Sequence, residues 1–333
     1  MLYIPYPDLI EKLESLFSNN GFEGNVASEL AMLFAKASLE GVPSHGLDRV
    51  AVFLGMVQKG KVLPGGKPSL MGSFGSFERW SGNFGPGPLN AQFSMDRAIS
   101  LAKDLGIGLV SLQSTNHWMR AGNYGWQAVD SGCIGICFTN TKPNMPAWGG
   151  KEPKLGNNPL VVAIPRKKGH VVLDLAMSQF SYGKLKTYLR EGKDMPFAAG
   201  FDSQGNLSNK PAEIIDNDLA LPIGLWKGAG LSMVLDMLAA VLSGGHAVHQ
   251  VGQSGDEFGL SQVFLCIDPV KLGLSDQIDS IMDAIIEDLH GSATFDGKVV
   301  RYPGENIASI REKNHQYGVP VDEGVWAGIL GML

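Results

Sequence analysis

The hydrophobic residues of this chain change their spacing twice between its two ends. Helical spacing, in which apolar residues recur every three to four positions, covers roughly the first 60 residues and returns at 227–244 and 275–290. Short apolar runs of β type, separated by glycine, lie between them at 107–112, 134–139 and 160–164. Because the two patterns are interleaved, we expect an α+β fold with a helical lobe assembled from distant segments of the chain.

The changes in spacing also indicate where the lobes begin and end. Residues 1–71 are expected to form the first part of the helical lobe, and residues 226–295 its second part. Residues 72–225 are expected to form an α+β lobe, in which 171–175 adds another strand, and residues 296–333 to add a strand and the C-terminal helices. A chain of 333 residues is long enough for two lobes with a cleft between them, which suits an enzyme.

Composition excludes several classes of function. The formal net charge is −6 and the longest basic run is Arg166–Lys168, so the chain lacks the basic surface that nucleic acid requires. Cys133, Cys137 and Cys266 suggest neither a disulfide framework nor a metal knuckle and fit a reducing compartment. No stretch approaches about 20 uninterrupted apolar residues. We therefore expect a soluble, cytoplasmic protein with a small-molecule substrate and with neither nucleic acid nor membrane as a partner.

A glycine-rich loop of the Rossmann type, which joins a strand to a helix, is missing. The nearest candidate, Gly85–Asn90, carries two prolines, lacks the third glycine and has no clear strand before it, and no P-loop occurs elsewhere. Trp226–Gly230 opens an apolar helix, where free backbone N–H groups would favour a pyrophosphate or a carboxylate. Its glycines would equally serve only to let the start of the helix pack closely.

Ser44, His45 and Gly46 follow a helix that must end at 40–43, since glycine and proline cannot continue it. An imidazole can carry a proton near neutral pH, and Arg49 lies four residues further on. Reduction of a ketone requires a hydride and a proton for the developing alkoxide, and arginine is suited to clamp a carboxylate. The segment is thus a candidate catalytic site, although a capping Ser-His pair with a surface arginine would give the same sequence.

A second histidine and arginine, His117 and Arg120, follow the run at 107–112, and loops that follow strands often carry ligand contacts. The pair could hold a polyol acid. Equally, His117 could satisfy a buried carbonyl while Trp118 and Met119 enter the core.

Two further groups are weaker candidates. His246 and His249 have a metal-like spacing, but no nearby carboxylate or cysteine completes a ligand shell, so we expect no metal. Asp194 could orient a histidine by accepting its N–H, or could simply be solvated.

Several of these segments together resemble the malate/L-lactate dehydrogenases of the sulfolactate type, a family that binds NAD(P) without a Rossmann fold. The resemblance covers nearly the whole chain and is carried by Ser44–Gly46 with Arg49, Asn116–His117, Gly156–Pro159, Asp174–Ser178 and Trp226–Gly228. A second set of segments is similar to a subgroup that reduces a sugar-derived 2-oxo acid. This set comprises Asn116–Arg120, Tyr124–Ala128, Gly135–Cys137, Phe180–Gly183 and Tyr302–Gly304.

The resemblance implies roles for individual residues. His45 would be the proton donor in the NAD(P)H-dependent reduction of a 2-oxo acid ketone, and Ser44, Arg49, His117 and Arg120 are our candidates for binding the substrate. The cofactor would contact three stretches, which are His170, Val171, Val172, Leu173, Asp174, Leu175 and Ala176, then Trp226 and Lys227, then Gly304, Glu305 and Asn306. The implied fold is a cofactor lobe on a largely antiparallel sheet beside a helical lobe, usually as a homodimer.

Two points remain open. NADH (NAD) is the expected cofactor, but the long connection at 166–170 carries basic groups that could meet the 2′-phosphate of NADPH. The substrate could also be malate, sulfolactate, ureidoglycolate or a cyclic imino acid, as in other members of the family. From a different class, the chain could be a sugar-acid binding protein that has lost hydride transfer.

Overall fold

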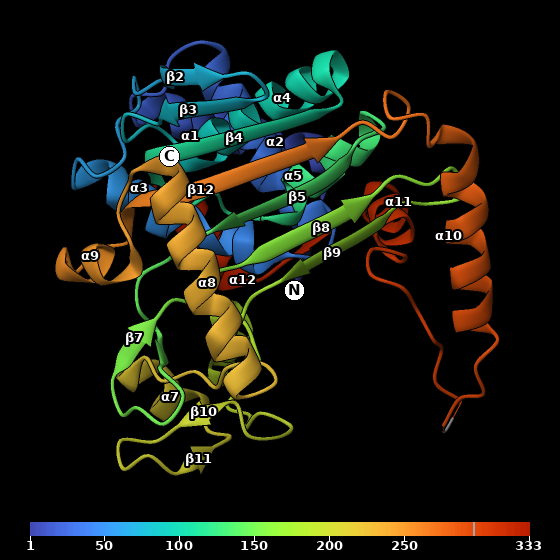
Figure 1. Cartoon of the computed structure of the whole chain (residues 1–333). Coiled ribbons are helices and arrows are strands. Elements are labelled where there is room, and N and C mark those ends of the chain that lie inside the picture. Colours follow the sequence, from blue (N-terminus) through green and yellow to red (C-terminus); the bar gives the residue numbers. More distant parts are fainter. Residues whose placement is uncertain (296) are drawn as a thin grey trace.

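The computed structural model describes residues 1–295 and 297–333 (Figure 1). Its α-helices are α1 (Tyr6–Asn19), α2 (Asn25–Leu39), α3 (Val50–Gln58), α4 (Gly87–Leu105), α5 (Gly122–Asp130), α6 (Tyr182–Arg190), α7 (Pro211–Asn217), α8 (Trp226–Ser243), α9 (Val248–Gln253), α10 (Ser275–His290), α11 (Ile307–Tyr317) and α12 (Glu323–Leu330). Two 3-10 helices, η1 (Pro43–His45) and η2 (Leu47–Arg49), join α2 to α3.

Seven strands form the central sheet, and the described residues also form three small two-stranded sheets. In spatial order, the large sheet contains β2 (Ser69–Phe74), β3 (Phe77–Ser81), β4 (Ile107–Asn116), β12 (Phe258–Ile267), β5 (Ile134–Thr139), β8 (Leu160–Ile164) and β9 (Val171–Leu175). The small sheets pair β1 (Leu2–Ile4) with β13 (Val319–Val321), β6 (Met145–Pro146) with β7 (Pro153–Leu155), and β10 (Gly200–Phe201) with β11 (Leu207–Ser208). In the large sheet the β3–β4 pair is parallel and the other neighbouring pairs are antiparallel, which confirms the expected α+β fold with a largely antiparallel sheet.

The segment around Gly85 differs from the sequence prediction in one respect. A strand does precede it, because β3, α4 and the parallel strand β4 form a single β–α–β unit. The sequence does not indicate this strand because it is short and polar. Its buried position is occupied by Glu78, which pairs with Arg97, and not by an apolar side chain. The tight turn serves packing: a Cβ on Gly87 would overlap the carbonyl oxygen of His117. Gly85–Asn90 does not line the cavity described below.

Alternation along β12 explains how helices cover both faces of the sheet. Phe264 and Cys266 belong to the apolar cluster that contains Met95 of α4, whereas Val263 belongs to the cluster that contains Leu235 of α8. Figure 1 shows α8 crossing one face of the sheet, with α4 and α5 on the other. Helix α8 is long and apolar enough to cross a membrane by length and composition alone, but its contacts with β12, β4 and β5 are those of a covering helix.

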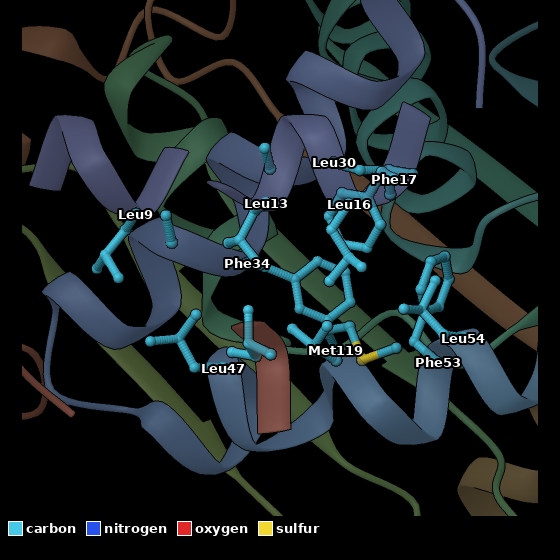
Figure 2. Close-up of a cluster of buried hydrophobic side chains, with 14 of the residues drawn as sticks. Leu9, Leu13, Leu16, Phe17, Leu30, Phe34, Leu47, Phe53, Leu54 and Met119 are labelled. Atoms are coloured by element: carbon cyan, nitrogen blue, oxygen red, sulfur yellow. The ribbon is translucent and has the colours of Figure 1, made fainter. Parts of the chain in front are cut away.

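The two ends of the chain close a separate cluster of apolar side chains (Figure 2). Leu9, Leu13, Leu16 and Phe17 of α1 fall on one helical face and are buried against Leu30 and Phe34 of α2, Phe53 and Leu54 of α3, and Met119. Val319, Val321 and Ile329 complete it from the C-terminal end. Each fully buried side chain of this size contributes about 1.5–3 kcal/mol. A helical cluster made from distant segments is therefore present.

Residues 226–295, expected as the second part of the helical lobe, contribute no described residue to the cluster of Figure 2. Helix α8 lies on the sheet, and α10 stands beside the turn between β8 and β9 (Figure 1). The periodicity of α8 could not indicate its partner, because apolar residues lie on nearly all its sides. The lobe boundaries drawn from the sequence stay a prediction.

Candidate active site

A cavity of about 670 Å³ lies where the helical cluster meets the β9 edge of the sheet. One side is formed by residues 42–52 and 117–122, which we call the imidazole side. Another side is formed by residues 172–176 with 303–307, which we call the strand side. Residues of 141–144 and of α6 complete the wall. All five predicted catalytic and substrate-binding residues, which are Ser44, His45, Arg49, His117 and Arg120, line this cavity.

The local sequence presents His45 to the cavity. Pro43 starts the 3-10 turn η1, and Gly46 ends it. A Cβ on Gly46 would overlap the side chain of Ser38 and the backbone of Phe34, so only glycine lets this turn lie directly on α2. The Oγ of Ser44 lies 3.2 Å from Nδ1 of His45, which leaves Nε2 as the nitrogen free to meet a substrate.

The two imidazoles stack. The ring centroids of His45 and His117 are 6.0 Å apart and their planes differ by 10°. Burial first, and then the neighbouring His117, Arg49 and Arg120, together lower the pKa of His45 to about 3. At neutral pH, His45 is therefore neutral.

His117 faces two hydrogen-bond donors. The backbone N–H of Met119 donates to Nδ1 over 3.0 Å, and Nη2 of Arg49 lies 3.2 Å from Nε2. A neutral imidazole accepts at only one nitrogen, and burial followed by Arg49 holds the pKa of His117 well below its usual value. The backbone contact is fixed by the chain, so the Arg49 contact is the one that can be exchanged for a ligand carboxylate.

Two of the three predicted cofactor stretches meet on the strand side. The N–H of Val172 donates to the carbonyl of Pro303 over 3.0 Å, which brings Gly304 to the middle of β9. Val172, Leu173, Asp174, Ala176 and Gly304 line the cavity; His170, Val171, Leu175, Glu305 and Asn306 flank it without lining it.

The third stretch reaches the end of the same strand. The N–H of Ile223 donates to the carbonyl of Met177 over 2.8 Å, so Trp226 and Lys227 lie just beyond β9, outside the lining of the cavity. The indole of Trp226 is exposed.

Sequence reasoning missed several cavity residues. Lys142 pairs with Asp218 (Nζ to Oδ2, 3.1 Å), and its backbone N–H donates to Glu257. Lys186 of α6 also lines the cavity, and burial, then Arg49 and Lys142, lower its pKa. Lys142 follows the end of β5 closely, so the strand-exit argument that singled out His117 could have found it. Asp194 is exposed and away from the cavity lining.

The chain belongs to the malate/L-lactate dehydrogenase family, whose sequence model matches residues 4–330. This confirms the resemblance read from the sequence, and it makes the chain an oxidoreductase of a kind that uses a nicotinamide cofactor.

Named relatives narrow the comparison. The chain is 41% identical to a 2,3-diketo-L-gulonate reductase of Citrobacter koseri and 42% identical to one of Klebsiella pneumoniae, each over 98% of both chains. Among solved structures, malate dehydrogenase from Pyrococcus horikoshii matches with a TM-score of 0.90 and 27% identity, covering 99% of this chain and 94% of that one. Sulfolactate dehydrogenase from Methanocaldococcus jannaschii matches with a TM-score of 0.90 and 25% identity, covering 99% and 96%.

Proposed function

We propose that the chain is a reductase that converts 2,3-diketo-L-gulonate to 3-dehydro-L-gulonate with NADH, and that His45 donates the proton. The observation that carries this proposal is one cavity whose wall holds His45, Arg49 and His117 in contact with one another together with the strand side. The relatives that share 41–42% identity over nearly the whole chain support the substrate.

The strand side fits a nicotinamide dinucleotide. Asp174 accepts the N–H of Gly122 at Oδ2 (2.8 Å) and is open to the cavity, so its other oxygen is available to a ribose hydroxyl or an amide. Gly304 has φ +91° and approaches the backbone of Val172 so closely that a Cβ would crowd it. When bound there, the cofactor would supply the hydride.

Proton transfer falls to the imidazole side. With Nδ1 of His45 directed at Ser44, the Nε2–H of the protonated ring would donate to the oxygen of the reduced ketone. A substrate carboxylate held by Arg49 would cancel part of the positive charge that lowers the pKa of His45. Substrate binding would thereby raise that pKa toward the range in which the ring can carry a proton.

The basic connection before β9 favours NADH over NADPH. Arg166 and Lys168 both pair with Asp283 of α10, at 2.6 Å and 2.7 Å, and Lys167 pairs with Asp279 at 2.9 Å. These cations already have carboxylate partners, so they are not poised for the 2′-phosphate of NADPH.

A homodimer in the cytoplasm is the form we propose for the active protein. Helix α8 turns Leu231, Val234, Leu238 and Val241 outward, all exposed and on one helical face. An apolar surface of this kind typically meets a partner. Light scattering of the purified protein should give twice the mass of one chain.

The test is an NADH oxidation assay with a panel of 2-oxo acids. We expect 2,3-diketo-L-gulonate to give a higher kcat/KM than the oxo acids of malate or sulfolactate, or than a cyclic imino acid. A preference for a substrate without a polyol tail would contradict the proposed substrate. NADH binding without turnover of any of them would contradict the proposed reaction.

A further inference from the structure

Glu40, the residue at the C-terminal end of α2, is almost completely buried, with 1% of its surface exposed. Its Oε2 accepts a hydrogen bond from Nη1 of Arg120, which follows β4. Its Oε1 accepts from Nε (3.0 Å) and Nη2 (2.5 Å) of Arg311 on α11. One carboxylate therefore holds two arginines that come from widely separated parts of the chain.

Stability alone is a poor explanation for this cluster. Buried ion pairs contribute little compared with apolar side chains of similar volume, because removing charges from water is costly. The cluster also keeps one more positive than negative charge, and the Nε of Arg120 is buried without a hydrogen-bond partner. A buried cluster that keeps desolvated charges and an unpaired Nε next to the cavity points to a role in binding.

Arg120 belongs to the imidazole side, and its charge also reaches the strand side. It lines the cavity, with a side chain that is 5% exposed, and its charge acts on both His45 and Asp174. Because one end of its guanidinium is bonded to Glu40, the position of the rest is set by Glu40.

Glu40 also connects the two sides through α11. This helix begins directly after the stretch 304–306, and Asn314 donates to the carbonyl of Leu39 over 2.7 Å. The Arg311 guanidinium lies 5.8 Å from the centre of the Trp126 ring, and Trp126 lines the cavity.

We infer that Glu40 is a positioning residue for substrate binding, which fixes the Arg120 guanidinium at the cavity and joins α11 to the segment that carries His45. The inference rests on the proposed function, because the ligand that Arg120 meets is the anionic or hydroxylated end of a sugar acid.

The test uses variants that keep the charge of the cluster. Glu40→Gln combined with Arg311→Met leaves the net charge of the cluster unchanged and so limits unfolding, while Arg120 loses its charged anchor. We expect the KM for the oxo acid to rise about tenfold or more, as for the loss of one charge-assisted contact, with the dissociation constant of NADH within about threefold. Glu312→Gln, an exposed neighbour on α11, is the matched control and should change neither value.

A mutant cycle separates positioning from general support. If Glu40 acts through Arg120, the triple variant that also carries Arg120→Met should have nearly the same KM for the oxo acid as the single variant Arg120→Met. The inference would be overturned if the KM increases of the double variant and of Arg120→Met multiplied in the triple variant. It would also be overturned by weaker NADH binding with an unchanged KM.

Calorimetry with L-gulonate, a sugar acid without a ketone, gives the same comparison without turnover. A wild-type protein that binds L-gulonate but reduces no oxo acid would refute the proposed function, and the role of Glu40 would still be decided by the variants.

Discussion

The two sides of the cavity hold a ligand by different means. The imidazole side presents charged and ionisable side chains, and it is anchored in the helical cluster through Leu47 and Met119 (Figure 2). The strand side presents apolar residues and Gly304 around Asp174, and it is anchored by the hydrogen bonds of β9. The comparison teaches that the two ligands of one reaction are held by different kinds of groups, so a substitution should affect one ligand more than the other, even though Gly122 and Arg120 act on Asp174 across the two sides.

Removing the imidazole of His45 should have the largest effect. His45→Ala should lower kcat for reduction by about 10²–10⁴-fold, the usual contribution of a positioned acid. NADH binding, measured by fluorescence titration, should stay unchanged because the strand side is untouched. Full turnover by this variant would end the claim that His45 donates the proton.

Removing the charge of Arg49 should affect both binding and ionisation on the imidazole side. Arg49→Gln should raise the KM for the oxo acid by about 10–100-fold, through the loss of a charge-assisted hydrogen bond. It should also raise the pKa of His45, since Arg49 is one of the positive groups that lower it. Donation requires protonated His45 in the complex with substrate, so kcat is lost as the pH rises through the pKa of His45 in that complex, and that loss should move to higher pH. A shift to lower pH would contradict the assigned electrostatics.

A substitution on the strand side should weaken the binding of NADH more than the binding of the oxo acid. Asp174→Asn keeps an oxygen that can accept the N–H of Gly122 but removes the charge facing the cavity. We expect the dissociation constant of NADH to rise about tenfold, with a much smaller change in the KM of the oxo acid. If the KM rose and NADH binding did not, the assignment of the two sides would have to be exchanged.

The smallest effect should come from the contact between α10 and the β8–β9 turn. Asp283→Asn would release Arg166 and Lys168 and should raise kcat/KM for NADPH relative to NADH about two- to fivefold, a modest change typical of partly exposed ion pairs. Asp288→Asn, an exposed position on the same helix, is the control. An unchanged ratio would mean that the 2′-phosphate binds elsewhere.

The strands that the sequence predicted best are those with continuous apolar runs. β5, β8 and β9 have the predicted bounds because short, mainly apolar runs next to glycine or proline are distinctive by composition alone. β3 was missed because its buried position is a glutamate. Long-range packing, as of α8 on the sheet, could not be predicted because an apolar helix does not specify its partner.

The residues of the candidate site also divide into those that a local sequence pattern reveals and those that only long-range packing brings together. His45 could be found because proline and glycine mark the turn that presents it. Lys142 and Asp218, which meet at the cavity, come from segments 76 residues apart that carry no shared pattern. Glu40 could not be recognised for a similar reason, since a charged residue at a helix end normally faces water.

The pairing of β1 with β13 has a consequence for the order of assembly during synthesis. Helices α1 to α3 are made first, yet their apolar cluster requires Val319, Val321 and Ile329 from the opposite end of the chain. While the chain is still being translated, these helices have no complete core, and the turn that carries His45 has no finished support. The site should therefore become competent only after residues 319–329 have left the ribosome, and a nascent chain stalled before residue 319 should remain protease-sensitive in its first 60 or so residues.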